Sequence, residues 1–103
     1  MNFVEVAVAR PVRKLFTYRA PPGMNLNVGH VVQVPFGRQK ITGYVVATPA
    51  ESSLKTIKPI TRLLDPIPAF DSSQLRFFRW IANYYLSSLG DVIATALPSR
   101  FKA

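Results

Sequence analysis

The chain has 103 residues, 49% of them hydrophobic, and carries 13 Lys and Arg against 5 Asp and Glu, for a net charge of +8. This length and hydrophobic content predict one folded domain with a modest core and exclude a disordered chain. The chain has no Cys and 1 His, which excludes disulfides, thiolate zinc sites and imidazole metal clusters.

The first part of the chain predicts β-structure. Residues 3–8 alternate, with three valines on one face of a first strand. Residues 15–20 predict a second strand that places Phe16 and Tyr18 on the same side. Pro21-Pro22-Gly23 then predicts a turn, because proline fixes φ and glycine tolerates a positive φ.

Residues 30–47 predict a β-hairpin, because two β-branched runs flank a short connection, Phe36-Gly37-Arg38-Gln39. Pro35 has no N–H and therefore indicates an edge or a bulge on the first of these strands. The tip presents free backbone groups, a glycine and two cations, at Gly37, Arg38 and Lys40. Such a tip suits an anionic ligand, although a tight surface turn with solvated charge is its commoner meaning.

The next segments predict the end of the sheet. Residues 48–55 are polar and predict a mobile connector. Residues 57–64 predict a last strand, which Pro59 interrupts and so places at an edge. The two prolines in residues 65–69 mark the boundary with a helical part.

Residues 71–97 predict two helices. Asp71 and Gln74 have the spacing of a capping box, and apolar residues then recur at helical intervals to Tyr85. So wide a stripe predicts burial on more than one face, with a core that includes Phe77, Phe78 and Trp80. Leu89-Gly90 is expected to break the first helix, and residues 91–97 to form a short second helix that ends at Pro98.

These elements predict a single α+β domain over residues 1–103. A twisted, barrel-like antiparallel sheet of about five strands occupies residues 1–65, and a C-terminal helical segment packs on it over residues 70–97. We expect a monomer.

The residue types in the sequence favour a binding function over catalysis. Acidic residues are few and distant in sequence, and neither a P-loop nor a dinucleotide fingerprint occurs, so the chain is not expected to be an enzyme. The basic charge favours nucleic acid as partner, with acidic membranes, acidic proteins and simple solubility as alternatives. No apolar run is long enough for a membrane span and the N-terminus lacks a signal peptide's basic start, so we expect a cytoplasmic bacterial protein with no membrane partner.

Cations recur on the loops beside the predicted strands, at Arg10, Arg13, Lys14, Arg38, Lys40, Lys55 and Lys58. Phe16 and Tyr18 fall between two of these groups. Basic grooves interleaved with aromatic rings hold single strands, since cations neutralise phosphates and rings stack on bases. Core packing is the alternative role for both rings.

Several short motifs follow one another at distinctive spacings: Phe16-Thr17-Tyr18, Pro21-Pro22-Gly23-Met24, residues 29–38, Gly43-Tyr44-Val45-Val46, Ile57-Lys58, Ala82-Asn83-Tyr84-Tyr85 and Ala96-Leu97-Pro98. In this order they resemble the N-terminal 3′-end DNA-binding domain of the PriA family of primosomal replication-restart helicases. The resemblance runs through nearly the whole chain. It implies a module that binds the 3′ end of the nascent leading strand at stalled replication forks and targets the helicase for replication restart.

The resemblance also implies that the chain is an N-terminal fragment of a larger ATP-dependent 3′–5′ DNA helicase. In that family the ATP site and the zinc-binding cysteines lie C-terminal to this region, so no cofactor is expected in this chain. The implied partners are DNA 3′ termini and forks, the primosome proteins and the rest of the helicase chain.

The family's pocket for the terminal nucleotide carries over to Phe16, Thr17, Tyr18, Gly37 and Lys58. The resemblance implies that Phe16 and Tyr18 shape its wall, that Gly37 allows close backbone approach and that Lys58 meets a phosphate. It also implies that main-chain contacts there let any base be accepted. Further phosphate contacts are expected at Arg13, Lys14, Arg38 and Lys40.

Thr17 departs from the family pattern, which often has Asp at this position to accept a hydrogen bond from the free 3′-hydroxyl. Thr17 can accept the same bond without charge, so the contact should be weaker. We therefore expect a preference for 3′ ends that persists in a softer form.

Two other functions fit the same sequence. An RNA-binding SH3-like barrel shares the basic charge and the pattern of residues 29–46, but would be indifferent to a free 3′ terminus. A protein-interaction module that docks helicase domains would bind through an apolar patch and tolerate high salt.

Overall fold

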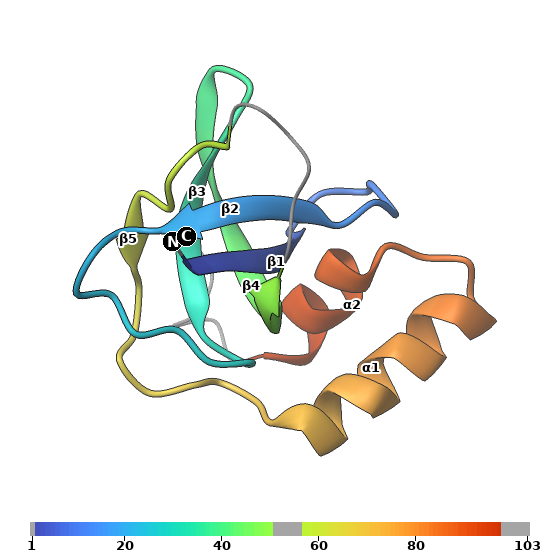
Figure 1. Cartoon of the computed structure of the whole chain (residues 1–103). Helices are drawn as coiled ribbons and strands as arrows, with labels where there is room; N and C mark the ends of the chain where they lie inside the picture. Colours follow the sequence, from blue (N-terminus) through green and yellow to red (C-terminus); the bar gives the residue numbers. More distant parts are fainter. Residues whose placement is uncertain (1, 51–56, 98–103) are drawn as a thin grey trace.

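The computed structural model describes residues 2–50 and 57–97. This part of the chain forms five strands followed by two helices (Figure 1), which confirms the predicted α+β class. The elements are β1 (Asn2–Val8), β2 (Phe16–Ala20), β3 (Val31–Phe36), β4 (Gln39–Ala50), β5 (Arg62–Leu63), α1 (Ser72–Tyr84) and α2 (Leu89–Ala96).

The strands form one antiparallel sheet in the order β2-β1-β4-β3-β5. The two ends of this sheet curl towards each other, because Arg19 of β2 forms a bridge with Pro59, just before β5. The Arg19 N–H donates to the Lys58 carbonyl at 3.0 Å, and the Ile60 N–H donates to the Arg19 carbonyl at 2.9 Å. These bonds give the sheet the barrel-like form that the sequence predicted.

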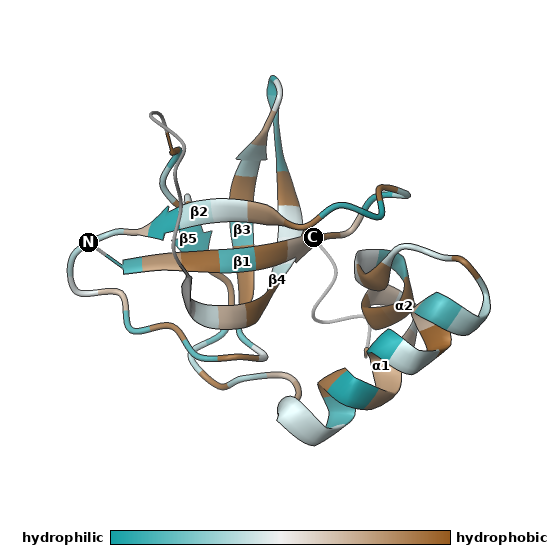
Figure 2. Cartoon of the chain, turned by 45° about the vertical axis from the view of Figure 1, so that its right-hand side comes forward, coloured by the Kyte–Doolittle hydropathy of each residue, from teal (hydrophilic) through white to brown (hydrophobic). Residues whose placement is uncertain are grey.

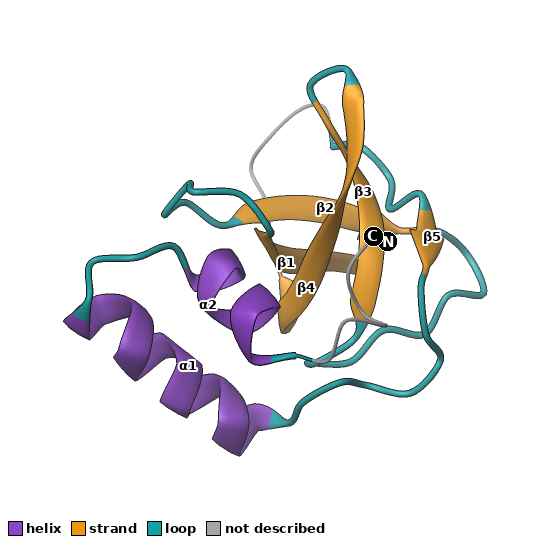
Figure 3. Cartoon of the chain, turned by 180° about the vertical axis from the view of Figure 1, so that it is seen from behind, coloured by secondary structure: helices purple, strands orange, loops and turns teal. Residues whose placement is uncertain are grey.

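Both faces of the sheet are buried. Alternation along the strands turns Val32 and Val45 towards the barrel interior, while Val31 and Tyr44 face the helices. Both helices lie together on one side of the sheet (Figure 3). There the ring of Phe70 packs edge-on against Phe78, with 5.6 Å between ring centroids. The fold therefore has two cores that share the sheet.

The predicted hairpin is confirmed, with β3 and β4 joined by a two-residue turn at Gly37 and Arg38. Gly37 has φ of 62°, a left-handed conformation that glycine adopts without steric cost. The hairpin tip projects from the sheet and is hydrophilic (Figure 2). Pro35 lies on an edge, as predicted, because β5 pairs only with Val32 and Gln33 of β3.

Side-chain caps fix both helix starts. The Asp71 carboxylate accepts from the Gln74 N–H at 2.9 Å, and the Gln74 side chain accepts from the Asp71 N–H at 3.0 Å, which confirms the predicted capping box. The Ser88 hydroxyl accepts from the Asp91 N–H at 3.2 Å and donates to the Arg10 carbonyl at 2.9 Å. Ser88 therefore starts α2 and also ties it to the loop that follows β1.

Two predictions about the end of the sheet were wrong. β4 continues through Ala50, so part of the predicted connector 48–55 is strand; the remainder, with Lys55, lies outside the described residues. The predicted strand 57–64 shrinks to Arg62–Leu63. Lys58 and Ile60 form hydrogen bonds with Arg19 of β2, whereas Arg62 and Leu63 pair with β3.

Two predictions about the helices were also wrong. The first helix ends before Leu86, which has φ of 54°, and Gly90 lies inside α2 rather than at the break. Phe77 and Trp80 are not core residues, because their exposed fractions are 58% and 62%. α1 packs through one face only, formed by Leu75, Phe78 and Ala82. Pro98 lies outside the described residues.

We expect the fold to lose stability at alkaline pH because of Tyr44. Burial, with the negative charge of Asp91 as a second cause, raises the pKa of Tyr44 from 10.0 to about 12. Above pH 10 the unfolded chain releases this proton while the folded chain retains it, so the free energy of unfolding falls as pH rises from 10 to 12. At pH 11 the loss should be about 1.4 kcal/mol.

Urea unfolding at pH 9 and pH 11 measures this loss, with Tyr44→Phe as the control. The variant has no phenol at this position, so its stability should fall less over the same interval. An equal fall in both proteins would rule out Tyr44 as the source.

Candidate nucleic-acid interface

A pocket of about 370 Å³ opens between β2, the β3–β4 hairpin and the segment before β5. It is lined by Lys14, Leu15, Phe16, Thr17, Tyr18, Pro35, Phe36, Gly37, Ile57 and Lys58. We call it the end pocket. All five residues predicted to hold a terminal nucleotide line it, although they come from three separate segments. Its volume falls within the roughly 300–1,000 Å³ typical of small-molecule sites.

Tyr18 forms the fixed part of the end pocket. Its side chain is buried in the barrel core, and its hydroxyl donates to the Pro35 carbonyl at 2.7 Å. Burial also raises the pKa of the phenol. Tyr18 thus joins β2 to β3 across the pocket, as a core residue that also lines the pocket.

Phe16 and Phe36 line the pocket beside Tyr18. Their rings pack edge to face, with centroids 5.2 Å apart and an interplanar angle of 85°. The Lys14 ammonium lies 5.6 Å from the centroid of the Phe16 ring, within range of a cation–π contact. An aromatic surface with a cation at its edge can accept a base or sugar together with its phosphate.

Thr17 and Gly37 line the pocket in different ways: Thr17 lies on a strand, and Gly37 lies in the hairpin turn. Thr17 pairs with Glu5 of β1, and alternation along β2 turns its side chain away from the face that carries Phe16 and Tyr18. Thr17 nevertheless lines the pocket. Gly37 is exposed, and a Cβ at this position would lie in open space, so a ligand can approach its main chain closely.

Lys58 combines a fixed backbone with an exposed side chain. Its carbonyl accepts the Arg19 N–H in the bond that curls the sheet closed. The side chain is exposed at the pocket. The fold therefore sets the position of this cation while leaving its ammonium available to an anion.

Only one of the four residues predicted to contact phosphates lines the end pocket. Lys14 lines the end pocket, whereas Arg38 and Lys40 are exposed at the hairpin tip outside it. Arg13 lines a different hollow, next to the helices.

Sequence reasoning missed Phe36 and Ile57 as pocket residues. Phe36 shares a strand face with Val32 and Val34 and so resembles a core residue. Its position next to Gly37 was the signal that could have found it, because a strand end beside an open turn is only partly covered. Ile57 gave no comparable signal, since its place depends on a contact with a distant strand.

Other features of the described residues that bear on function are His30, possible metal ligands and possible membrane spans. Both ring nitrogens of His30 bond to the backbone: Nδ1 accepts from the Asn27 N–H at 2.8 Å, and Nε2 lies 3.0 Å from the Pro66 carbonyl. In the described residues no three His, Cys, Asp or Glu side chains group as metal ligands would. Neither described helix has the length and apolarity needed to cross a membrane.

Comparison with known proteins assigns the chain to a family. The family model of a 3′DNA-binding domain (3′BD) matches residues 5–98. The replication restart protein PriA of Haemophilus influenzae is 38% identical over 104 residues, covering 99% of this chain and 14% of that protein. PriA of Treponema pallidum is 36% identical over 107 residues, covering 95% and 16%. This chain thus spans a small fraction of these relatives, and it belongs to the 3′DNA-binding domain family of the replication restart protein PriA.

Proposed function

We propose that this chain binds the 3′ terminus of a DNA strand in the end pocket and so targets a larger replication-restart helicase to its substrate. One observation carries the proposal above the others. The five positions that the family resemblance implies are distant in sequence, yet they line a single pocket that also has two exposed cations, Lys14 and Lys58.

The end pocket can test for a chain terminus by shape. Tyr18 is held by its bond to Pro35, so the inner wall cannot move aside for a continuing strand. Lys14 and Lys58 neutralise the phosphate that precedes the terminal nucleotide. The open main chain at Gly37 contacts that nucleotide without reading its base edge, which makes binding independent of sequence.

In the cell, the bound end would be that of the nascent leading strand at a stalled fork. The module would act as a monomer in the bacterial cytoplasm, at the nucleoid, with primosome proteins as further partners. We assign it no reaction of its own. ATP hydrolysis, helicase activity and zinc binding would belong to the remaining length of the relatives.

A second function is favoured by the outward face of α1. Trp80 and Tyr84 stack there with ring centroids 5.4 Å apart and an interplanar angle of 13°, and both side chains are mostly exposed. Large exposed apolar groups of this kind mark protein interfaces. We therefore propose this face, with Phe77, as the surface that docks the remaining helicase domains.

Fluorescence anisotropy with oligonucleotides that differ only in a free 3′-hydroxyl or a 3′-phosphate tests the end pocket. Binding should be tighter for the free hydroxyl, and the difference should persist at two salt concentrations. Equal affinity for both ends would contradict the proposal. RNA and DNA versions of the free-end probe distinguish the RNA-binding alternative, which predicts no dependence on the terminus.

Thr17→Asp is expected to sharpen the preference for a free 3′-hydroxyl by a few-fold, because a carboxylate is a stronger acceptor than a hydroxyl. Glu5 lies directly opposite Thr17, so the new carboxylate also faces a like charge, and overall affinity should not rise. The ratio of dissociation constants for the two probes measures the change.

Glu5→Gln in the Thr17→Asp background removes the opposing charge and serves as the control. It should bind more tightly than Thr17→Asp alone while leaving the sharpened ratio in place. If Thr17→Asp leaves the ratio unchanged, Thr17 has no role at the 3′-hydroxyl.

A further inference from the structure

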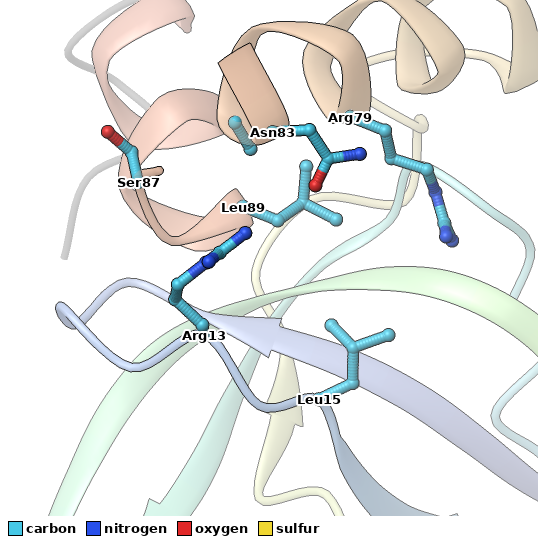
Figure 4. Close-up of a pocket in the computed structure, with 7 residues that line it drawn as sticks. Arg13, Leu15, Arg79, Asn83, Ser87 and Leu89 are labelled. Carbon is cyan, nitrogen blue, oxygen red and sulfur yellow. The ribbon is translucent and has the colours of Figure 1, made fainter. Parts of the chain in front are cut away.

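A second hollow lies beside the end pocket, between the loop that precedes β2 and the helices. Its volume is about 160 Å³, below the roughly 300 Å³ at which pockets for whole small molecules begin. Arg13 lines it from the loop, while Asn83 and Arg79 line it from α1 (Figure 4). We call it the helix pocket. Its size suits a single phosphate group better than a nucleotide.

The charged residues that line the helix pocket are all basic. Arg13 and Arg79 supply guanidinium groups, Asn83 an amide and Ser87 a hydroxyl, and no acidic residue is among the described residues that line it. Both arginines are exposed, so their charges are available to a ligand. Guanidinium groups match phosphate oxygens with two parallel hydrogen bonds each. An anion with several oxygens is therefore the fitting ligand.

The two pockets are direct neighbours. Leu15 lines both of them, and the residues before it diverge: Lys14 lines the end pocket and Arg13 the helix pocket. Successive Cα atoms lie about 3.8 Å apart, so an anion beside Arg13 is close to any ligand beside Lys14. One nucleic-acid molecule can therefore occupy both pockets.

We propose that the helix pocket binds a backbone phosphate of the DNA whose 3′ terminus occupies the end pocket. This inference rests on the proposed function of the end pocket. The phosphate belongs either to the same strand, upstream of its terminus, or to the complementary strand. Two attachment points would fix the direction of the DNA across the sheet and bring it against the N-terminal loop and α1.

The test compares the double variant Arg13→Gln/Arg79→Gln with a control double variant, Arg62→Gln/Arg76→Gln. Both remove two positive charges from exposed residues, but the control residues line neither pocket. Anisotropy is measured over a salt series with a single strand bearing a free 3′ end and with the same strand annealed to a template. Far-UV circular dichroism confirms that both variants fold.

The helix-pocket variant should bind about tenfold more weakly than the control. Its salt slope should become shallower by roughly 0.7 for each single-strand phosphate that the variant no longer neutralises. Weaker binding of both probes assigns the phosphate to the end-bearing strand, and weaker binding of the annealed probe alone assigns it to the complementary strand. Equal effects of the two variants on both probes would overturn the proposal.

Measuring the preference for a 3′-hydroxyl over a 3′-phosphate distinguishes failure of the helix pocket from failure of the end pocket, on whose proposed function the helix pocket depends. The helix-pocket variant should keep the wild-type preference, because the end pocket is intact. If the wild-type chain shows no preference, the end pocket fails as a terminus sensor. The comparison of the two variants still decides whether the helix pocket holds a phosphate.

Discussion

Gly90→Ala is expected to destabilise the fold by about 2–3 kcal/mol, although alanine is the better helix former. Inside a helix this change normally stabilises by about 1 kcal/mol. Here the new Cβ would overlap the carbonyl oxygen of Val8. That oxygen belongs to β1, next to β4 in the sheet, and also accepts the Arg10 N–H at 2.8 Å. The backbone cannot yield there, so α2 must move off the sheet, with the cost of an overpacked core.

Urea unfolding followed by circular dichroism measures this cost. Thr95→Ala is the matched control, because it places alanine at an exposed position of the same helix. It should change stability by less than about 1 kcal/mol. A Gly90→Ala protein as stable as the wild type would mean that α2 does not pack this closely on β1.

The same glycine shows where sequence reasoning reaches its limit. Local signals were sufficient for the hairpin at Gly37 and for the Asp71–Gln74 capping box, because neighbouring residues determine both structures. Local reasoning also predicts a helix break at Gly90, which lies inside α2. The actual reason for a glycine there is the close approach of β1, a strand far earlier in the chain, which no local pattern reveals.

Burial of the aromatic residues was hard to predict for a similar reason. Helical spacing correctly grouped Leu75, Phe78 and Ala82 on the packed face of α1. It could not show that the opposite face, with Trp80, lacks a packing partner among the described residues. Composition says how much apolar surface exists, whereas topology decides how much of it is covered.

The end pocket was predicted through family resemblance and not through periodicity. Strand alternation placed Phe16 and Tyr18 together, but nothing local related them to Lys58. The bond from the Arg19 N–H to the Lys58 carbonyl brings that segment to β2, where Lys58 lines the pocket. Such a contact between distant segments leaves no local signal in the sequence.

Lys58→Glu is expected to weaken binding of a free-ended single strand by about thirtyfold. Near the surface, in water, a charge pair about 4 Å apart contributes about 1 kcal/mol. Reversing the charge removes that attraction and adds a repulsion of similar size, so the total change is about 2 kcal/mol. The effect should shrink as salt rises, since both terms are screened. Anisotropy titrations at two salt concentrations measure it.

Arg62→Glu separates a local contact from the effect of net charge. It changes the charge by the same amount a few residues away, at an exposed position of β5 that does not line the end pocket. Because the Lys58 backbone is fixed by its bond to Arg19, its side chain can change without opening the barrel. Lys58→Glu should therefore unfold at the wild-type urea concentration while binding far more weakly than Arg62→Glu. Equally weakened binding in the two variants would show that the domain attracts DNA through its overall charge, with no phosphate held at Lys58.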